Sequence, residues 1–444
     1  MNKKLLWPLA VLLIASLACS IGTETPEPND VADSVAATLT ALGSGDGQPP
    51  EGQVSPQPGE TLQGQQVQPT IFTLAYVSNG DVWIIKGNNA PVQLTQLGDV
   101  IDVFLSDDGE RVVYEREMQP DYTSRLESID ADGGAPMPLL DQTDMDNFYP
   151  LDGAEHYRIY RFAFIPGTYE ALFNTRAVFM GPGLATNDDL YRLDTYTGQV
   201  TAVIPRGDGG DFVISPDGST LAISTPTGLG MADINGNNLQ QDLVTFTPVI
   251  TYSEYMYSPP PVWLPDSSAY GAAIPSEDPL APNTTGTIWT VASNAATNEV
   301  LTVDGNFLFP QAFGAPMLSP NHQSVAAVRD TQVQNVQQLV IVNLNNANEA
   351  VYDQGNIRWY GWSPDGVHFA YAVNSTDLKI GQVGQPPINL ASGTAFEWIS
   401  ESQYIFTQGQ AGAWNIYRGA LGNPPVLLAS PASERVPKDA IPGS

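Results

Sequence analysis

The chain has 444 residues, with 48 acidic residues against 17 basic ones, and its formal net charge is −31. A field of this sign repels nucleic acid and anionic lipid headgroups, so no nucleic acid is expected among the partners. A single cysteine, Cys19, leaves no pair for a disulfide, and the fold must be held by noncovalent packing, which a chain of this length can supply.

Residues 1–18 are predicted to form a signal peptide. Lys3 and Lys4 precede an apolar run over 5–18, which is shorter than the roughly 20 residues of a membrane-spanning helix. Cys19 follows the run directly in the order Ser-Leu-Ala-Cys, which resembles a bacterial lipoprotein signal and implies a lipid on that cysteine. The alternative is a free terminal thiol on a secreted protein. An extracytoplasmic chain, anchored by lipid to the cell membrane or cell envelope, is therefore expected.

The segment 19–70 is predicted to be a disordered tether. It is rich in Pro, Gly, Gln and Thr and cannot bury enough apolar surface to fold alone. Within it, apolar residues at 31, 35, 39 and 42 recur at near-helical spacing. A short helix over 31–42 is expected, either frayed in solvent or in contact with the membrane or a partner.

Residues 71–431 show short β-branched or alternating runs separated by Gly, Pro, Asn and Asp, which indicates an all-β domain. One four-residue corner recurs there at intervals of 36 to 59 residues, the range of propeller blades and solenoid repeats. At the second position of the corner, Pro has the φ that a type I turn requires. Asp or Asn is favoured at the third position, and Gly at the fourth adopts a positive φ. The corner occupies 106–109, 215–218, 264–267, 319–322 and 363–366, with degenerate copies at 165–168 and 399–402.

A strand is predicted on either side of each corner and two more follow, so each unit contains four antiparallel strands. These units resemble the TolB-like propeller repeat, whose later Asp-x-x-x-Gly turn matches 130–134 and 194–198. The resemblance implies an all-β fold, a seven- or eight-bladed β-propeller of four-stranded antiparallel blades. Eight blades need one more strand, from 431–441 or 65–71, so the tail 432–444 is a candidate for ring closure. Seven are expected if a degenerate unit is only an insertion.

No catalytic residue, metal or cofactor is predicted. Propeller-linked peptidases carry a Gly-x-Ser-x-Gly elbow on a separate hydrolase domain, and neither is found in the sequence. Three histidines give little material for a metal site or a catalytic triad. The acidic stretch 144–155 matches a calcium loop only in part, because Phe148 and Tyr149 stand where a ligand and a glycine are needed. A solvated acidic loop is the alternative.

Two clusters are candidate binding residues. The first is basic and comprises Tyr157, Arg158, Arg161, Arg176 and Arg192. It would bind an anion or a carboxylate ligand; the alternative is local pairing with Asp188, Asp189 and Asp194. The second is aromatic and proline-rich and would suit a recognition loop, with packing between blades as the alternative. It comprises Tyr252, Tyr255, Tyr257 and Trp263.

These features predict a noncatalytic extracytoplasmic binding or scaffold lipoprotein, whose propeller loop faces meet a cell-envelope or extracellular protein, or a glycan. One alternative is a propeller glycan hydrolase or lyase that uses carboxylates of the central funnel. A second alternative is a glycan- or solute-binding lipoprotein. Convergent carboxylates in a deep axial pocket would favour the enzyme, and aromatic platforms on one loop face would favour the glycan-binding protein.

Overall fold

A computed structural model describes residues 37–38, 71–148, 153–179, 187–251, 256–374, 376–410, 413–431 and 438–442. The chain divides into two units, Met1–Ala36 and Ala37–Ser444, and the described residues all belong to the second. The predicted signal peptide, Cys19 and most of the tether therefore lie outside the described residues. Of the helix expected over 31–42, only Ala37 and Thr38 are described, and they form a strand.

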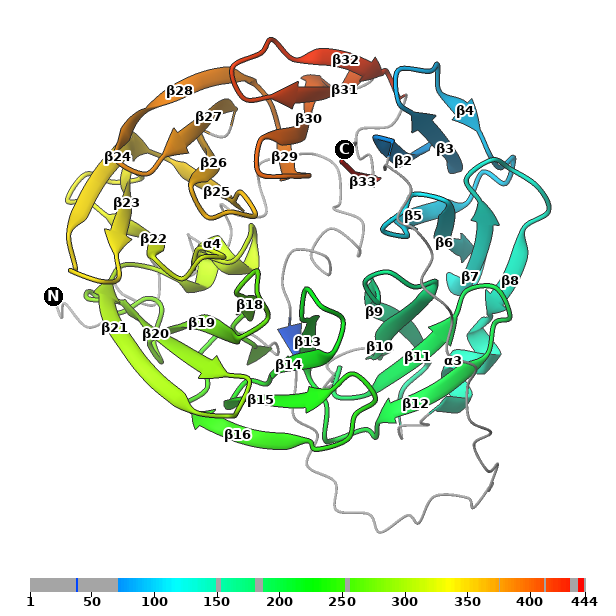
Figure 1. The fold of residues 1–444 in the computed structure, drawn as a ribbon, viewed down its shortest axis with the longest axis horizontal. Coiled ribbons are helices and arrows are strands. Elements are labelled where there is room, and N and C mark those ends of the chain that lie inside the picture. The colour runs from blue at the N-terminus through cyan, green and yellow to red at the C-terminus, as the bar shows by residue number, and fades with distance from the viewer. Residues whose placement is uncertain are drawn as a thin grey trace, which may run out of the picture. The chain divides into compact units, whose positions relative to one another are not determined.

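Within the described residues, the second unit is a ring of eight antiparallel blades (Figure 1). From inside to outside, the first four blades are β33 (Lys438–Ile441), β2 (Thr73–Ser78), β3 (Asp81–Lys86) and β4 (Val92–Gln93); β5 (Val100–Leu105), β6 (Arg111–Met118), β7 (Thr123–Asp130) and β8 (Met137–Leu140); β9 (His156–Phe164), β10 (Glu170–Val178), β11 (Leu190–Asp194) and β12 (Val200–Ile204); and β13 (Asp211–Ile214), β14 (Thr220–Ser224), β15 (Gly228–Asp233) and β16 (Gln240–Thr245).

The remaining blades are β18 (Val262–Trp263), β19 (Ala269–Pro275), β20 (Thr285–Ala292) and β21 (Thr297–Asp304); β22 (Ser324–Asp330), β23 (Gln337–Asn343) and β24 (Glu349–Gly355); β25 (Ile357–Trp362), β26 (His368–Val373), β27 (Asp377–Gln382) and β28 (Gln385–Ser392); and β29 (Ala395–Trp398), β30 (Gln403–Gln410), β31 (Ala413–Ala420) and β32 (Val426–Ala429). In the sixth blade the innermost strand is reduced to an isolated bridge between Leu318 and Val325.

Three short elements lie in connections between blades. Helix α3 (Gln142–Phe148) precedes the third blade, and α4 (Leu308–Ala312) precedes the sixth. Strand β17 (Met256–Tyr257) lies between the fourth and fifth blades and pairs with β1 (Ala37–Thr38).

The recurring corner joins the first and second strands of a blade, and in the four copies that begin with serine this serine holds the turn. In the fourth blade the Ser215 hydroxyl donates to the Asp217 carboxylate at 2.6 Å and accepts from the Thr220 amide at 2.9 Å. The same pair of bonds forms around Ser106, Ser319 and Ser363. Glycine provides the positive φ at Gly218, where φ is 72°. The serine therefore ties the start of the second strand to the turn.

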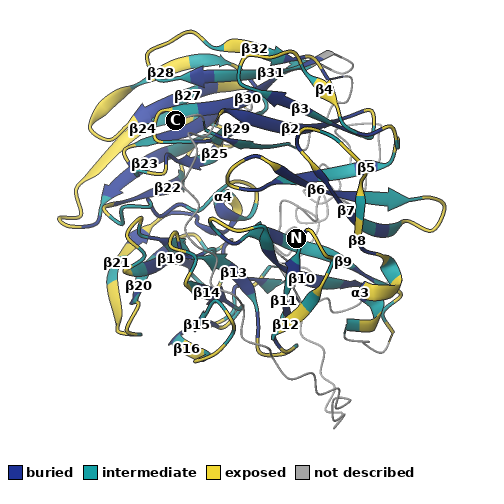
Figure 2. Ribbon diagram, turned by 45° about the vertical axis from the view of Figure 1, so that its right-hand side comes forward, coloured by how far each residue is buried: buried dark blue, intermediate teal, exposed yellow. Residues whose placement is uncertain are grey.

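The core lies between neighbouring blades rather than within one blade. Residues of the first and second blades, such as Val82 and Val112, share one buried cluster, and residues of the eighth and first, such as Ile405 and Leu74, share another. Buried residues fill the middle strands, whereas exposed ones gather on outer strands and turns (Figure 2). This packing positions the blades without a disulfide.

The ring closes through the carboxyl-terminal strand. Strand β33 pairs with β2, with Ile441 opposite Thr73 and Lys438 opposite Tyr76. The first blade is therefore completed by both ends of the propeller, and the number of blades is eight, one of the two numbers expected.

Candidate functional site

The strands of a blade alternate in direction, so the two faces of the ring carry different loops. One face carries the corners between first and second strands. The other carries the turns between second and third strands, such as 225–227 and 276–284, together with the connections between blades, such as 205–210 and 246–251. We call the latter the connection face.

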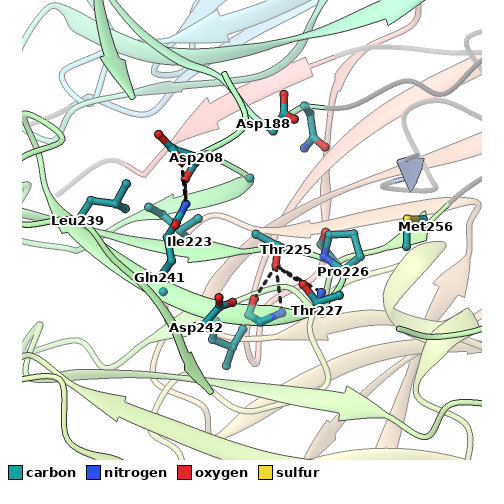
Figure 3. A pocket seen from close by; sticks show the side chains of 18 residues that line it. Asp188, Asp208, Ile223, Thr225, Pro226, Thr227, Leu239, Gln241, Asp242 and Met256 are labelled. Atoms are coloured by element: carbon teal, nitrogen blue, oxygen red, sulfur yellow. Dashed lines mark hydrogen bonds between the residues drawn. The ribbon is translucent and has the colours of Figure 1, made fainter. Parts of the chain in front are cut away.

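A cavity of about 330 Å³ opens on the connection face between the third and fourth blades (Figure 3). Its apolar wall includes Ile223, Pro226 and Leu239, and its polar part includes Asp188, Asp208 and Asp242 on three separate loops or strands. We call it the glycine-rich pocket because glycines supply much of its backbone: Gly207, Gly209, Gly210, Gly228 and Gly230. Its volume lies at the lower end of the range for small-ligand sites, about 300 to 1,000 Å³.

Glycine is required at two of these positions by close approach of the backbone. A Cβ on Gly209 would lie 2.7 Å from the Asp188 carbonyl oxygen, and one on Gly230 would lie 2.6 Å from the Gln240 carbonyl oxygen. The Asp188 carbonyl accepts hydrogen bonds from the amides of Gly207 and Gly209, at 3.1 and 2.8 Å. The pocket wall is therefore a rigid, hydrogen-bonded backbone surface.

The rim of the pocket is acidic. The Gln241 side-chain amide donates to the Asp208 carbonyl oxygen at 2.9 Å and approaches its carboxylate at 3.4 Å, which fixes the Asp208 loop against β16. Asp242 is exposed and has a φ of 55°, a conformation that Asp and Asn tolerate better than most residues. Asp188 lies 3.4 Å from the Arg206 guanidinium. The rim therefore presents carboxylates to a bound group.

Asp189, the residue after Asp188 of the rim, is buried and hydrogen-bonded. The Asp189 carboxylate accepts from the Thr175 amide at 2.8 Å and from its hydroxyl at 2.5 Å. Burial raises the pKa of Asp189 to about 6, although its hydrogen bonds with Thr175 and the charge of Arg206 act in the opposite direction. A carboxyl group with this pKa could act as a general acid, but Asp189 is only 2% exposed and both of its carboxylate oxygens accept hydrogen bonds from Thr175.

The predicted basic cluster is distributed over contacts within the protein. Arg158 pairs with Glu117 at 2.9 Å, Arg161 lies 3.9 Å from Asp211, and Arg192 lies 3.6 Å from Glu170. The Arg176 guanidinium lies 5.0 Å from the centre of the Tyr160 ring. Tyr157 is buried and accepts a hydrogen bond from Arg206 at 3.1 Å.

Local pairing with Asp188, Asp189 and Asp194 was the alternative to an anion site. Arg158, Arg161 and Arg192 instead meet acids of a neighbouring strand or of an adjacent blade, whereas Arg206, which follows them in sequence, lies 3.4 Å from Asp188. The strand carrying Arg158 and Arg161 also departs from strict alternation, because β9 and β10 shift register opposite Asn174 and Thr175. A ligand role for the cluster stays a prediction.

The predicted aromatic segment contributes to packing where it is described. The Trp263 indole donates to the Val213 carbonyl oxygen at 3.0 Å and so joins the fifth blade to the fourth. The Tyr257 hydroxyl accepts from Gln311 at 2.9 Å, and both side chains are buried. Tyr252 and Tyr255 lie outside the described residues. Recognition by this segment also stays a prediction.

The acidic stretch 144–155 is partly helical. Asp144 and Asp146 lie on α3, and the Asp146 carboxylate accepts from the Tyr157 amide at 2.9 Å and from Gln142 at 2.8 Å. Asp152 lies outside the described residues. Among the residues that the structure describes, no group of three or more His, Cys, Asp or Glu side chains is arranged to hold a metal. The described helices also include none that is long and apolar enough to span a membrane.

Sequence reasoning missed the glycine-rich pocket. Two runs rich in glycine, 207–210 and 228–230, were the available signal, but only folding of the connection 205–210 onto the fourth blade brings them together. The same is true of Asp208 and Asp242, which are 34 positions apart in sequence and line one cavity.

Comparisons with solved structures find other propellers. The β-propeller domain of the Trilobed protease from Pyrococcus furiosus is 9% identical, with a TM-score of 0.46 over 76% of this chain and 99% of that one. An oligogalacturonate lyase in complex with manganese is 12% identical, with a TM-score of 0.42 over 80% and 83%. TolB from Acinetobacter baumannii is 17% identical, with a TM-score of 0.32 over 65% of this chain.

This chain spans 65% of the length of TolB, less than two thirds of it. No protein-family model matches the sequence, and no curated protein matches it.

Proposed function

We propose that this chain is a noncatalytic extracytoplasmic binding protein, whose connection face recognises cationic side chains of a protein partner. The observation that carries the proposal is the glycine-rich pocket, a preformed cavity with an acidic rim. In a chain with a net charge of −31, the surrounding field also favours a cationic ligand and speeds its association.

The chemistry of the rim fits a guanidinium or ammonium group. Asp208 and Asp242 offer carboxylate oxygens at the mouth, and an arginine fork can take two of them at once. The partly exposed side chains of Pro226 and Leu239, which line the pocket, can cover the aliphatic stem of the same ligand side chain. Both halves of a lysine or arginine side chain are therefore accommodated.

The proposed location follows from the amino-terminal sequence. Lys3, Lys4 and the apolar run over 5–18 direct export, and lipid on Cys19 anchors the chain. The tether would then hold the propeller away from the membrane surface, where the connection face can meet a cell-envelope or extracellular protein.

Calorimetric titration with N-acetyl-arginine methylamide tests the proposal. We expect saturable binding that weakens at least threefold between 50 and 300 mM salt, and the double variant Asp208→Asn/Asp242→Asn should weaken it about tenfold or more. Asn keeps the backbone conformation that Asp242 needs. Asp377→Asn, an exposed carboxylate of the seventh blade, is the matched control. Equal affinity for the uncharged citrulline analogue would contradict the proposal.

A further inference from the structure

A second cavity opens on the connection face between the fourth and fifth blades. Its volume is about 290 Å³, and aromatic and acidic side chains meet in it. We call it the acidic aromatic pocket, and the residues that carry its chemistry are Phe246, Glu277, Trp289 and Glu299.

The arrangement of these side chains follows from the strand register. Trp289 on β20 lies directly opposite Glu299 on β21, so the indole and the carboxylate emerge on the same side of the sheet. Glu277 follows β19 on the neighbouring turn. Both glutamates are exposed, and within the described part of the chain neither forms a salt bridge. Trp289 and Phe246 are half-buried and packed against the core between the blades.

An aromatic ring beside two carboxylates can bind an organic cation. A guanidinium or alkylammonium group over an indole gains about 0.5 to 2 kcal/mol from the ring quadrupole, and the carboxylates add charge-assisted hydrogen bonds. Because Trp289 and Phe246 are anchored in the core, their rings need little ordering when a ligand binds.

The two pockets are neighbours. Thr227 lines the glycine-rich pocket, Phe246 lines the acidic aromatic pocket, and the Phe246 amide donates to the Thr227 carbonyl oxygen at 2.9 Å. The turn between β14 and β15 therefore lies between the two pockets, which open on the same face of the ring. A ligand that occupies one pocket is within reach of the other.

We infer that the connection face recognises two cationic side chains of one extended segment, the first in the glycine-rich pocket and the second in the acidic aromatic pocket. This inference rests on the proposed function and adds to it the second site and the spacing of two positive charges. A polyamine carries the same chemistry as such a peptide, so the experiment includes both.

The test uses the whole propeller and a series of blocked peptides with two arginines separated by one to six glycine or serine residues. Linking two weak sites raises the affinity only when the linker spans them, so one spacing should bind at least tenfold more tightly than a peptide with one arginine. Spermidine is the polyamine probe. If spermidine binds as tightly as the best peptide, the two-cation peptide is wrong as the ligand.

Variants separate the second pocket from the first. Glu277→Gln/Glu299→Gln should reduce the best two-arginine peptide to the affinity of the one-arginine peptide, and leave the latter unchanged. Trp289→Phe should retain part of the gain, because phenylalanine keeps a weaker aromatic face. If the affinity does not change with the spacing of the two arginines, or if Glu277→Gln/Glu299→Gln binds the two-arginine peptide as tightly as the parent protein does, this inference is wrong. The proposed function is not affected by either result. Loss of one-arginine binding in the glutamine variant would instead contradict the assignment of the first cation to the glycine-rich pocket.

Discussion

Replacing Ile441 with alanine tests the closure of the ring. The Ile441 side chain is 9% exposed, and its Cδ1 atom would lie 2.6 Å from a Cβ on Gly109, so it fills the seam between the first and second blades. Ile→Ala removes three carbons, worth about 0.8 kcal/mol each in transfer free energy. With a small cavity term, Ile441→Ala should lower the free energy of unfolding by about 2 to 3 kcal/mol.

Urea unfolding followed by far-ultraviolet circular dichroism measures this change. Val426→Ala is the matched control, because Val426 lies on the outer strand β32 and is 63% exposed. The control should change the free energy of unfolding by less than about 0.5 kcal/mol. If Ile441→Ala behaves like Val426→Ala, β33 does not close the ring in solution and the first blade is incomplete.

Three further predictions concern buried charge, the predicted basic cluster and the anchor. Burial raises the pKa of Asp189 to about 6, so the folded state holds this proton more tightly than the unfolded state does. As the pH rises from 4 to 6, the wild type should therefore lose about 2 to 3 kcal/mol of stability relative to Asp189→Asn. Above pH 6 the difference between the two proteins should stay constant. Parallel pH profiles for the two proteins would refute this. Arg158→Ala should lower the free energy of unfolding by about 1 to 3 kcal/mol, because it removes a 2.9 Å ion pair and leaves Glu117 poorly solvated. Arg161→Ala should cost less than about 1 kcal/mol, because the Arg161 side chain is 41% exposed and lies 3.9 Å from Asp211, beyond hydrogen-bond distance. Equal losses would contradict this difference between the two contacts. Intact-mass analysis should find lipid on Cys19, and Cys19→Ser should release the protein from membranes, while an unmodified Cys19 in the wild type would refute the anchor.

The fold class could be predicted from the sequence because the corner encodes local geometry. Pro, Asp and Gly each favour one position of a turn, and recurrence of that turn indicated repeated antiparallel units. The role of the serine was missed, although its hydroxyl bridges Asp217 and the Thr220 amide in the fourth blade. Hydrogen bonds of this kind depend on the folded turn and not on a residue's preference for it.

The choice of closing strand could not be made from local pattern. Two segments offered a suitable strand, and the structure uses Lys438–Ile441. The reason is long-range: the Asp439 carboxylate accepts a hydrogen bond from the Leu105 amide at 2.7 Å, 334 positions away, and Ile441 fits beside a glycine. Only the folded ring brings these partners together.

The candidate site was harder to predict for the same reason. Arginines are conspicuous in an acidic chain, and the sequence pointed to them as ligand-binding residues, but folding supplies acidic or aromatic partners such as Glu117 for Arg158. Asp208 and Asp242 are two among many acidic residues, and nothing local distinguishes them. Their position at one pocket is a product of how the connection 205–210 folds onto the fourth blade.

A crystal structure of the propeller with a bound two-arginine peptide would show where the two guanidinium groups bind. We expect one in the glycine-rich pocket, within hydrogen-bond distance of the Asp208 or Asp242 carboxylate, and the other over Trp289 beside Glu299. A peptide bound elsewhere on the ring, with both pockets empty, would contradict this expectation.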